Sequence, residues 1–180
     1  MWFATPWFNA SSTLMKPSTP PMAEPHRFHL DLTVQRASRS SPLPSERQIR
    51  RWLRHALRRS AVITVRLVDR PEGRSLNQAF RHKDYPTNVL TFSYPDENPR
   101  ASARLHGDLV LCAPVVKAEA RQQHKPLLDH YAHLLIHGTL HLQGYDHENE
   151  QEAALMETLE IDLLTQLSIP NPYLDRPAHG

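Results

Sequence analysis

Three histidines in the C-terminal half of the chain have the spacing of a catalytic zinc site. His137 and His141 are four residues apart in a segment that predicts a helix, so both imidazoles project from one face. Gly144 lets the chain leave that helix, and His147 can then approach the same ion from another direction. Three protein ligands with an open fourth position are typical of catalytic zinc. We therefore expect one Zn²⁺ per chain, bound by His137, His141 and His147.

Two nearby residues are expected to support these ligands. His133 shares the helix face, but it lies about 12 Å from His141 along the axis at ~1.5 Å per residue, too far for both to join His137 on one ion. We therefore expect a supporting or surface role for His133. Asp146 is expected to orient an imidazole, as carboxylates behind zinc ligands do. The alternative for this whole cluster is a set of ordinary polar or core histidines.

The spacing resembles that of metzincin metallopeptidases, with one departure. Those enzymes carry a glutamate directly after the first histidine as general base. Gly138 occupies that position here and cannot accept a proton from a zinc-activated water. The metal site is therefore complete while the usual peptidase base is missing, which favours hydrolysis of a different bond.

A second stretch, Phe80 to Ser93, carries two cations before a proline turn and a strand. Arg81 or Lys83, if aimed at a phosphodiester bound at the metal, would offset charge on its oxygens during cleavage. Alternatively, the pair only complements the dipole at the end of a helix. The residues alone leave both readings open.

Together the two motifs resemble the bacterial YbeY family of endoribonucleases. The family pattern is approximately Tyr-Arg-x-Lys-Asp-x-Pro-Thr-Asn-Val-Leu-Ser-Phe, then Gly-Asp, then His-Gly-x-Leu-His-Leu-x-Gly-Tyr-Asp-His. The matching stretches are Phe80 to Phe92, Gly107-Asp108 and His137 to His147. Phe80 stands where the family has Tyr and Thr91 where it has Ser. The resemblance covers roughly residues 28–173, and no counterpart is expected for the first 25.

This resemblance implies that His137, His141 and His147 bind zinc and that Arg81 is the arginine needed for cleavage, with Lys83 as a candidate substrate contact. The implied substrate is single-stranded RNA, notably the 3′ end of the small-subunit ribosomal RNA precursor. The implied partners are the small ribosomal subunit and its assembly factors, in the bacterial cytoplasm. The general base stays open, since the 2′-hydroxyl of RNA is an alternative nucleophile to water. Two other functions are kept: a zinc peptidase, and a non-enzymatic ribosome-assembly factor with structural zinc.

The elements that must position these residues can be read from apolar periodicity and from helix and turn signals. Strands are predicted over 28–34, 61–68, 88–94 and 109–112, and helices over 45–57, 72–80, 114–124, 126–143 and 149–167. Phe80 is expected on the apolar side of the helix 72–80, and Leu155 among the core positions of the helix 149–167. Ser45 and Gln48 predict a capping box. The sequence thus predicts a single α+β domain over residues 26–175, with a four-stranded mixed sheet, about five helices and a metzincin-like zinc helix. Residues 1–25, rich in proline and polar residues, predict a disordered extension.

Composition narrows the class of protein further. A chain of 180 residues with a net charge of +2 is ordinary for a globular protein. No apolar run approaches the ~20 residues of a membrane span, so no membrane association is expected. Cys112 is the single cysteine and predicts a small buried hydrophobe. Arginines crowd residues 47–59, either as a solvated helix face or as a surface for phosphates.

Overall fold

The computed structural model describes residues 28–94, 104–145 and 149–174. Its sheet has four strands in the order β1-β2-β4-β3. β1 (Leu30–Arg36), β2 (Ala61–Val68) and β4 (Leu105–Cys112) are parallel, and β3 (Val89–Tyr94) pairs antiparallel with β4. The predicted mixed sheet and α+β class are confirmed.

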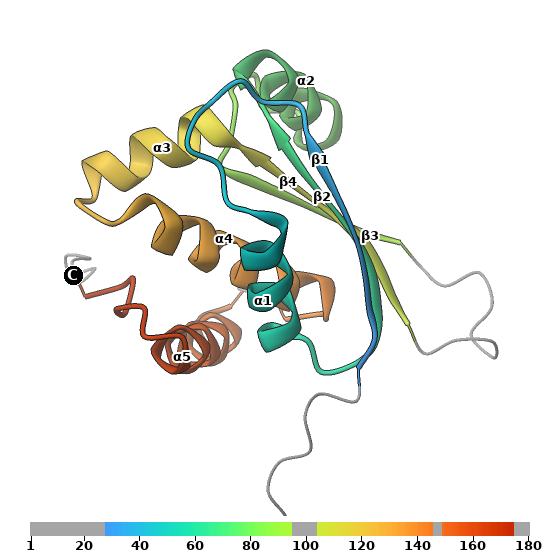
Figure 1. Ribbon diagram of the computed structural model, residues 1–180, viewed down its shortest axis with the longest axis vertical. Helices are drawn as coiled ribbons and strands as arrows, with labels where there is room; N and C mark the ends of the chain where they lie inside the picture. The colour runs from blue at the N-terminus through green and yellow to red at the C-terminus, as the bar shows by residue number, and fades with distance from the viewer. Residues whose placement is uncertain (1–27, 95–103, 146–148, 175–180) are drawn as a thin grey trace, which may run out of the picture.

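Five helices are present in the described ranges: α1 (Glu46–Ala56), α2 (Arg70–Arg81), α3 (Ala113–Gln122), α4 (Leu127–Leu142) and α5 (Glu150–Gln166). Figure 1 shows α1, α3, α4 and α5 together on one side of the sheet, while α2 lies apart at one end of the strands. None of these helices is long and apolar enough to cross a bilayer.

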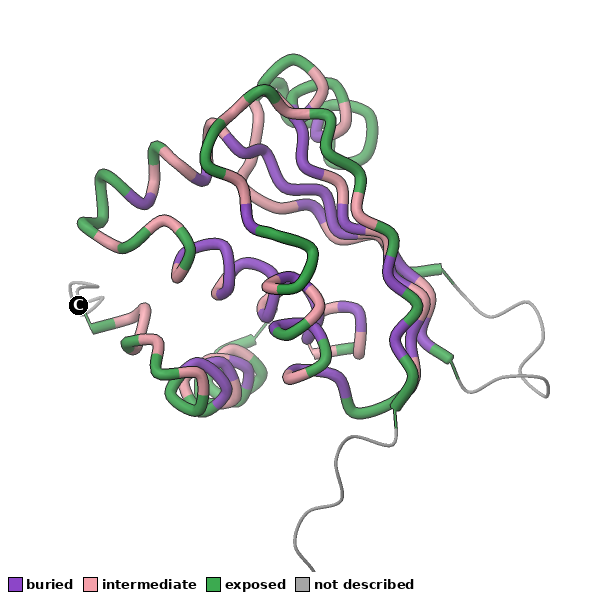
Figure 2. Tube along the Cα trace, viewed as in Figure 1, coloured by how far each residue is buried: buried purple, intermediate pink, exposed green. Residues whose placement is uncertain are grey.

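Helix α4 lies at the centre of the helical layer, because α1, α3, α5 and the strands β3 and β4 all pack against it. Its buried side chains meet the inward-facing residues of the strands, such as Val65 and Leu109, which are fully buried. Figure 2 shows the purple, buried part of the chain concentrated in α4 and the middle strands. His137 and His141 therefore lie on the helix that packs against most other elements of the described fold.

Local signals in the sequence explain where the elements begin and end. Ser45 caps α1, and the capping box with Gln48 is present as predicted. Asn149 caps α5 by accepting a hydrogen bond from the backbone N–H of Glu152 at 2.9 Å. Gly144 follows α4 at φ +90°, a conformation that L side chains rarely adopt. Cys112 is buried, as predicted.

Some expectations about the core were wrong. Leu155, expected in the core side of the last helix, is 55% exposed, because the buried stripe of α5 runs through Met156, Glu160, Leu163 and Leu164 instead. Phe80, expected on the apolar side of α2, is 62% exposed. Its ring makes an edge-to-face contact with Phe92 on β3, with centroids 4.9 Å apart. The buried residues of α2 are Gly73 and Asn77, so its last turn, which carries Phe80, lies outside the core.

Candidate metal centre

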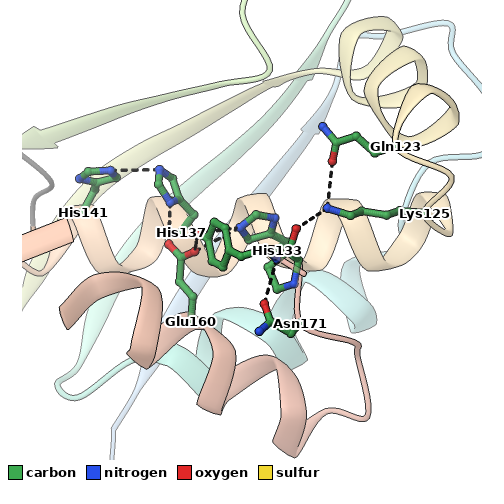
Figure 3. A network of polar contacts seen from close by, with 9 residues as sticks. Gln123, Lys125, His133, His137, His141, Glu160 and Asn171 are labelled. Carbon is green, nitrogen blue, oxygen red and sulfur yellow. Dashed lines mark hydrogen bonds and ion pairs between the residues drawn. The ribbon is translucent and has the colours of Figure 1, made fainter. Parts of the chain in front are cut away.

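Helices α4 and α5 bring the histidine face of the sequence motif against a buried acid. His137 Nδ1 lies 2.6 Å from Glu160 Oε1, and His133 Nε2 lies 3.1 Å from Glu160 Oε2. On the other edge of the same ring, His137 Nε2 lies 3.1 Å from His141 Nε2. Figure 3 shows this chain of contacts running from Glu160 through His137 to His141.

Glu160 is ionised in this setting although its side chain is fully buried. Burial alone would raise its pKa, but hydrogen bonds from His133 and His137 outweigh that effect and lower the pKa to about 2. The hydroxyl of Tyr173 donates a third hydrogen bond to the same carboxylate. Burial lowers the pKa of His133 and outweighs the opposing hydrogen bond with Glu160, so this imidazole is neutral near pH 7.

The carboxylate fixes the tautomer of His137. An ionised carboxylate only accepts hydrogen bonds, so Nδ1 of His137 carries the proton that it donates to Glu160. In the neutral imidazole the Nε2 atom then carries the lone pair, and it faces the Nε2 atom of His141. A carboxylate behind one ring nitrogen and a metal at the other is the usual arrangement of a histidine ligand.

The cluster contains two sets of atoms that could bind a metal ion. His133, His137 and Glu160 offer ligand atoms within 4.8 Å of one another and could hold a metal ion. Two nitrogens that each lie ~2.0–2.1 Å from one tetrahedral zinc ion are about 3.4 Å apart. The 3.1 Å between His137 and His141 is close to that value, whereas the 2.6 Å between His137 and Glu160 is that of a charged hydrogen bond. This distance is compatible with His137 and His141 as ligands, with Glu160 behind His137.

His147 and Asp146 lie outside the described residues. The third ligand and the orienting role of Asp146 therefore stay predictions. The same holds for the supporting role of His133, although His133 shares the Glu160 carboxylate with His137.

A hollow of about 820 Å³ opens beside these imidazoles. Its wall includes His137, His133, His130, Glu119, Asn88 and Lys125. His130 is 4% exposed, and its Nε2 donates to Glu119 Oε2 at 2.9 Å, while its buried Nδ1 has no hydrogen-bond partner among the described residues. Asn88 also donates to Glu119, at 3.1 Å. The hollow thus offers an anchored carboxylate, amides and a lysine next to the candidate metal ligands.

Glu119 is more accessible than Glu160, with 29% of its side chain exposed. Burial raises its pKa, but the hydrogen bonds from His130 and Asn88 outweigh burial and leave the pKa below its ordinary value. At neutral pH this carboxylate is therefore an acceptor that faces the hollow.

The predicted cations lie on a tightly held turn. Arg81 is the last residue of α2, and both Arg81 and Lys83 are exposed. Buried Asn77 holds the turn by donating to the carbonyl of Tyr85 at 2.6 Å. Neither cation pairs with an acid among the described residues, nor does the structure give either a contact with the histidines. Asn88, seven residues after Arg81 in the same sequence motif, lines the hollow beside His137.

Sequence reasoning missed both acids. Glu160 stood in an acidic run, but it lies four residues after Met156 and three or four before Leu163 and Leu164. An acid on the apolar stripe of a helix is a signal of a buried partner. No comparable signal marks Glu119, because its sequence neighbours in α3 are exposed Ala118 and buried Ala120.

Gly138 packs against the sheet rather than facing the metal ligands. A Cβ atom there would lie 2.7 Å from Leu109 Cδ2 and 3.2 Å from Thr91 Oγ1. Leu109 is fully buried. The glycine that removes the peptidase base therefore also lets α4 pack closely against the sheet at this position.

Comparisons with known proteins agree with these motifs. The profile of the family described as Endoribonuclease YbeY matches residues 34–168. Relatives named Endoribonuclease YbeY include one from Burkholderia cenocepacia, 53% identical over 85% of this chain and 91% of that protein. Another, from Thiobacillus denitrificans, is 55% identical over 80% of this chain and 96% of that protein.

A third relative of the same name, from Cupriavidus pinatubonensis, is 46% identical over 96% of this chain and 81% of that protein. Because this match leaves out only about 4% of the chain, it includes part of residues 1–25. The expectation that this segment has no counterpart is wrong for that relative. The match of the profile over most of the chain, with relatives about half identical, shows that the chain belongs to the Endoribonuclease YbeY family.

Proposed function

We propose that this protein is a zinc-dependent endoribonuclease that cuts single-stranded RNA. Family membership carries the endoribonuclease assignment. The paired Nε2 atoms of His137 and His141, 3.1 Å apart with Glu160 behind one of them, support the metal dependence. By resemblance, the proposed role is maturation of the 3′ end of small-subunit ribosomal RNA in the cytoplasm, with the small ribosomal subunit and its assembly factors as partners.

The residues of this chain would bind and orient the RNA around the candidate ligands. Zinc, when bound by His137, His141 and His147, supplies Lewis acidity and water that ionises near neutral pH. Glu160 holds the proton on Nδ1 of His137 and so keeps Nε2 available as a ligand atom. The hollow beside His137 is large enough for nucleotide groups, and Glu119 would accept hydrogen bonds from a base or ribose there.

Arg81 is proposed to bind the phosphate at the cleaved bond. A planar guanidinium donates two parallel hydrogen bonds to phosphate oxygens, which lysine does not. Arg81 is exposed and makes no ion pair within the described ranges, so its charge is available for a substrate. Lys83, two residues along the same turn, would add a weaker contact to the RNA backbone.

Two other functions are less well supported. A zinc peptidase would need a general base next to His137, and Gly138 leaves none there. A non-enzymatic assembly factor with structural zinc would need a fourth protein ligand, which the predicted set of three lacks.

The decisive experiment measures zinc content and cleavage of a single-stranded RNA by wild type and by Arg81→Glu. We expect Arg81→Glu to keep its zinc and its thermal stability and to lose cleavage by about a hundredfold or more, as for other lost transition-state contacts. Arg70→Glu, an equally exposed arginine at the other end of α2, is the matched control and should cleave normally.

Three results would contradict the proposal. Full cleavage by Arg81→Glu would remove the phosphate contact. Cleavage that survives complete removal of zinc would remove the metal dependence. Loss of the fold together with the zinc would favour a structural ion, because structural zinc contributes folding free energy outright.

A further inference from the structure

A second polar hollow lies between α1 and the end of α5, and none of His133, His137 and His141 lines it. It measures about 490 Å³ and is lined by Arg47, Arg50, Arg51, Arg54 and His55 from α1 and by Gln166 and Leu167 at the end of α5. The arginine-rich segment noted in the sequence therefore forms one concave surface between two helices. We call this surface the arginine hollow.

Three of the four arginines of the hollow have no acidic partner in the described part of the chain. Arg50 pairs with Glu46 at 2.8 Å, but Arg47, Arg51 and Arg54 make no ion pair or hydrogen bond with the described residues. Elsewhere in the same protein, half-buried Arg66 and exposed Arg74 do pair with acids. Arg66 pairs with Glu72 at 2.6 Å, and Arg74 binds Asp84 through two nitrogens at 2.6 and 2.7 Å.

This arrangement costs stability in the free protein. Like charges three or four residues apart on a helix repel one another, and Arg47, Arg51 and Arg54 have that spacing. Arg47 also lies in the first turn of α1, where the helix dipole disfavours a cation. A cluster that is unfavourable by itself and shaped as a hollow is suited to an anionic ligand.

We propose that the arginine hollow binds the phosphate backbone of RNA at a distance from the cleaved bond. The proposal rests on the proposed endoribonuclease function and extends it. Along a helix that rises ~1.5 Å per residue, Arg47 and Arg54 are about 10 Å apart. That span covers two or more phosphates of a strand, which recur at about 3.4 Å per nucleotide in a duplex and more widely when extended. Guanidinium groups suit phosphate because their forked donors match its oxygens.

The hollow is fixed relative to the candidate metal centre. Gln143, two residues after His141, donates from Nε2 to the carbonyl of Ala56 at 3.1 Å. Its Oε1 accepts from the backbone N–H of Arg58 at 2.8 Å. These two bonds tie the end of α1 to the end of α4, so one RNA strand would meet both surfaces in a constant geometry. Contact at the hollow would strengthen binding of long RNA without changing the chemistry at the metal.

The test compares two double variants with the same change in net charge. Arg47→Gln/Arg51→Gln alters the hollow, whereas Arg58→Gln/Arg59→Gln removes two exposed arginines that do not line it. Each protein is assayed for binding and cleavage of two single-stranded RNAs with one cleavage sequence. One RNA is trimmed to the few nucleotides around the cut, and the other is extended on both sides.

We expect the hollow variant to bind the extended RNA at least about tenfold more weakly than the control variant. Its slope of log affinity against log salt should flatten by about 1.4, at ~0.7 per lost phosphate contact. Both variants should cleave the trimmed RNA with the wild-type kcat and KM.

Other outcomes would overturn the inference. Equal weakening by both doubles would mean that net charge alone matters. Unchanged RNA binding by the hollow variant would exclude RNA as the occupant, and binding of an acidic peptide instead would assign the hollow to a protein. If the wild type fails to cut even the trimmed RNA, the proposed function fails, while the binding comparison still tests the hollow.

Discussion

The histidine face of α4 and the arginine face of α1 are two polar surfaces on neighbouring helices. They differ in whether their side chains contact a residue of opposite charge. On α4, the charged partner is already in place: Glu160 is fully buried and receives hydrogen bonds from His133 and His137. On α1, Arg47, Arg51 and Arg54 face a hollow with no acid among the described residues to meet them. Within the described ranges, the histidine surface contains its counter-charge and the arginine surface does not.

The difference bears on what each surface can do. A buried carboxylate that fixes an imidazole prepares a ligand before any metal arrives, because no side chain has to reorient. Unpaired arginines on a surface gain most of their interaction energy from an external anion. Mutations should therefore harm α4 through stability and metal affinity, and α1 through ligand affinity alone.

The largest effect is expected for His141→Ala. Loss of one imidazole of the facing pair should abolish stoichiometric zinc binding and reduce RNA cleavage by more than about a hundredfold, since even groups behind a ligand contribute about 10–100-fold. Metal analysis of the purified protein and a cleavage assay measure both. His29→Ala, an exposed histidine before β1, serves as the control. Normal zinc content in His141→Ala would break the ligand assignment.

Glu160→Gln is expected to come next. The neutral amide keeps the shape but loses the ionised acceptor of two imidazole hydrogen bonds, so the free energy of unfolding should fall by about 2 kcal/mol. Zinc affinity should fall about 10–100-fold. Urea unfolding and competition with a chelator test these values, with Glu150→Gln on the exposed start of α5 as control. An unchanged zinc affinity would show that Glu160 only supports the packing of α5.

A smaller effect, with a distinct pH dependence, is expected for Glu119→Gln. The folded-state pKa of Glu119 is below its ordinary value, so ionised Glu119 stabilises the fold above about pH 4.3, the unfolded value. This contribution is lost as the pH falls through the lowered pKa. Wild type should therefore exceed the variant by about 1 kcal/mol at pH 7, and the gap should close in acid. Urea titrations from pH 7 to acid measure it, and a gap that widens in acid would reverse the sign of the argument.

The smallest effect is expected for Arg51→Gln. Removing one of several repelling cations should leave the free energy of unfolding within about 0.5 kcal/mol of wild type, or raise it slightly. Thermal or urea unfolding at low salt gives the answer. A loss of more than about 1 kcal/mol, the size of an ordinary hydrogen bond, would mean that Arg51 has an internal partner and that the contrast between the two faces does not hold.

The sequence predicted the architecture well where local chemistry decides it. The strand Ala61–Val68 was predicted with its observed bounds, and the capping box of Ser45 placed the start of α1. It was less accurate where packing between distant elements decides. The residue type of Phe80 predicts a core position. Its exposure instead follows from the position of α2 at one end of the strands, where no other described element covers the last turn.

The candidate site divides in the same way. The pair His137 and His141 could be predicted because both belong to one helix, whose period fixes their relation. Glu160 comes from another helix, and only the packing of α5 on α4 brings it to His137. Glu119 reaches His130 through the packing of α3 on α4. The spacing of residues along the chain does not predict these contacts between side chains of different helices.

The position after the first histidine also limits what this scaffold can become. Substituting glutamate at Gly138 would drive a charged chain into the contact with Leu109 and Thr91, on the side of α4 that faces the apolar interior. The carboxylate would be desolvated there, remote from any bond to be cut, and α4 would be pushed off the strands. Replacing Gly138 by the glutamate of the metzincin motif would therefore not convert this protein into a peptidase. Helix α4 would first have to rotate relative to the sheet, and the packing between them would have to be redesigned.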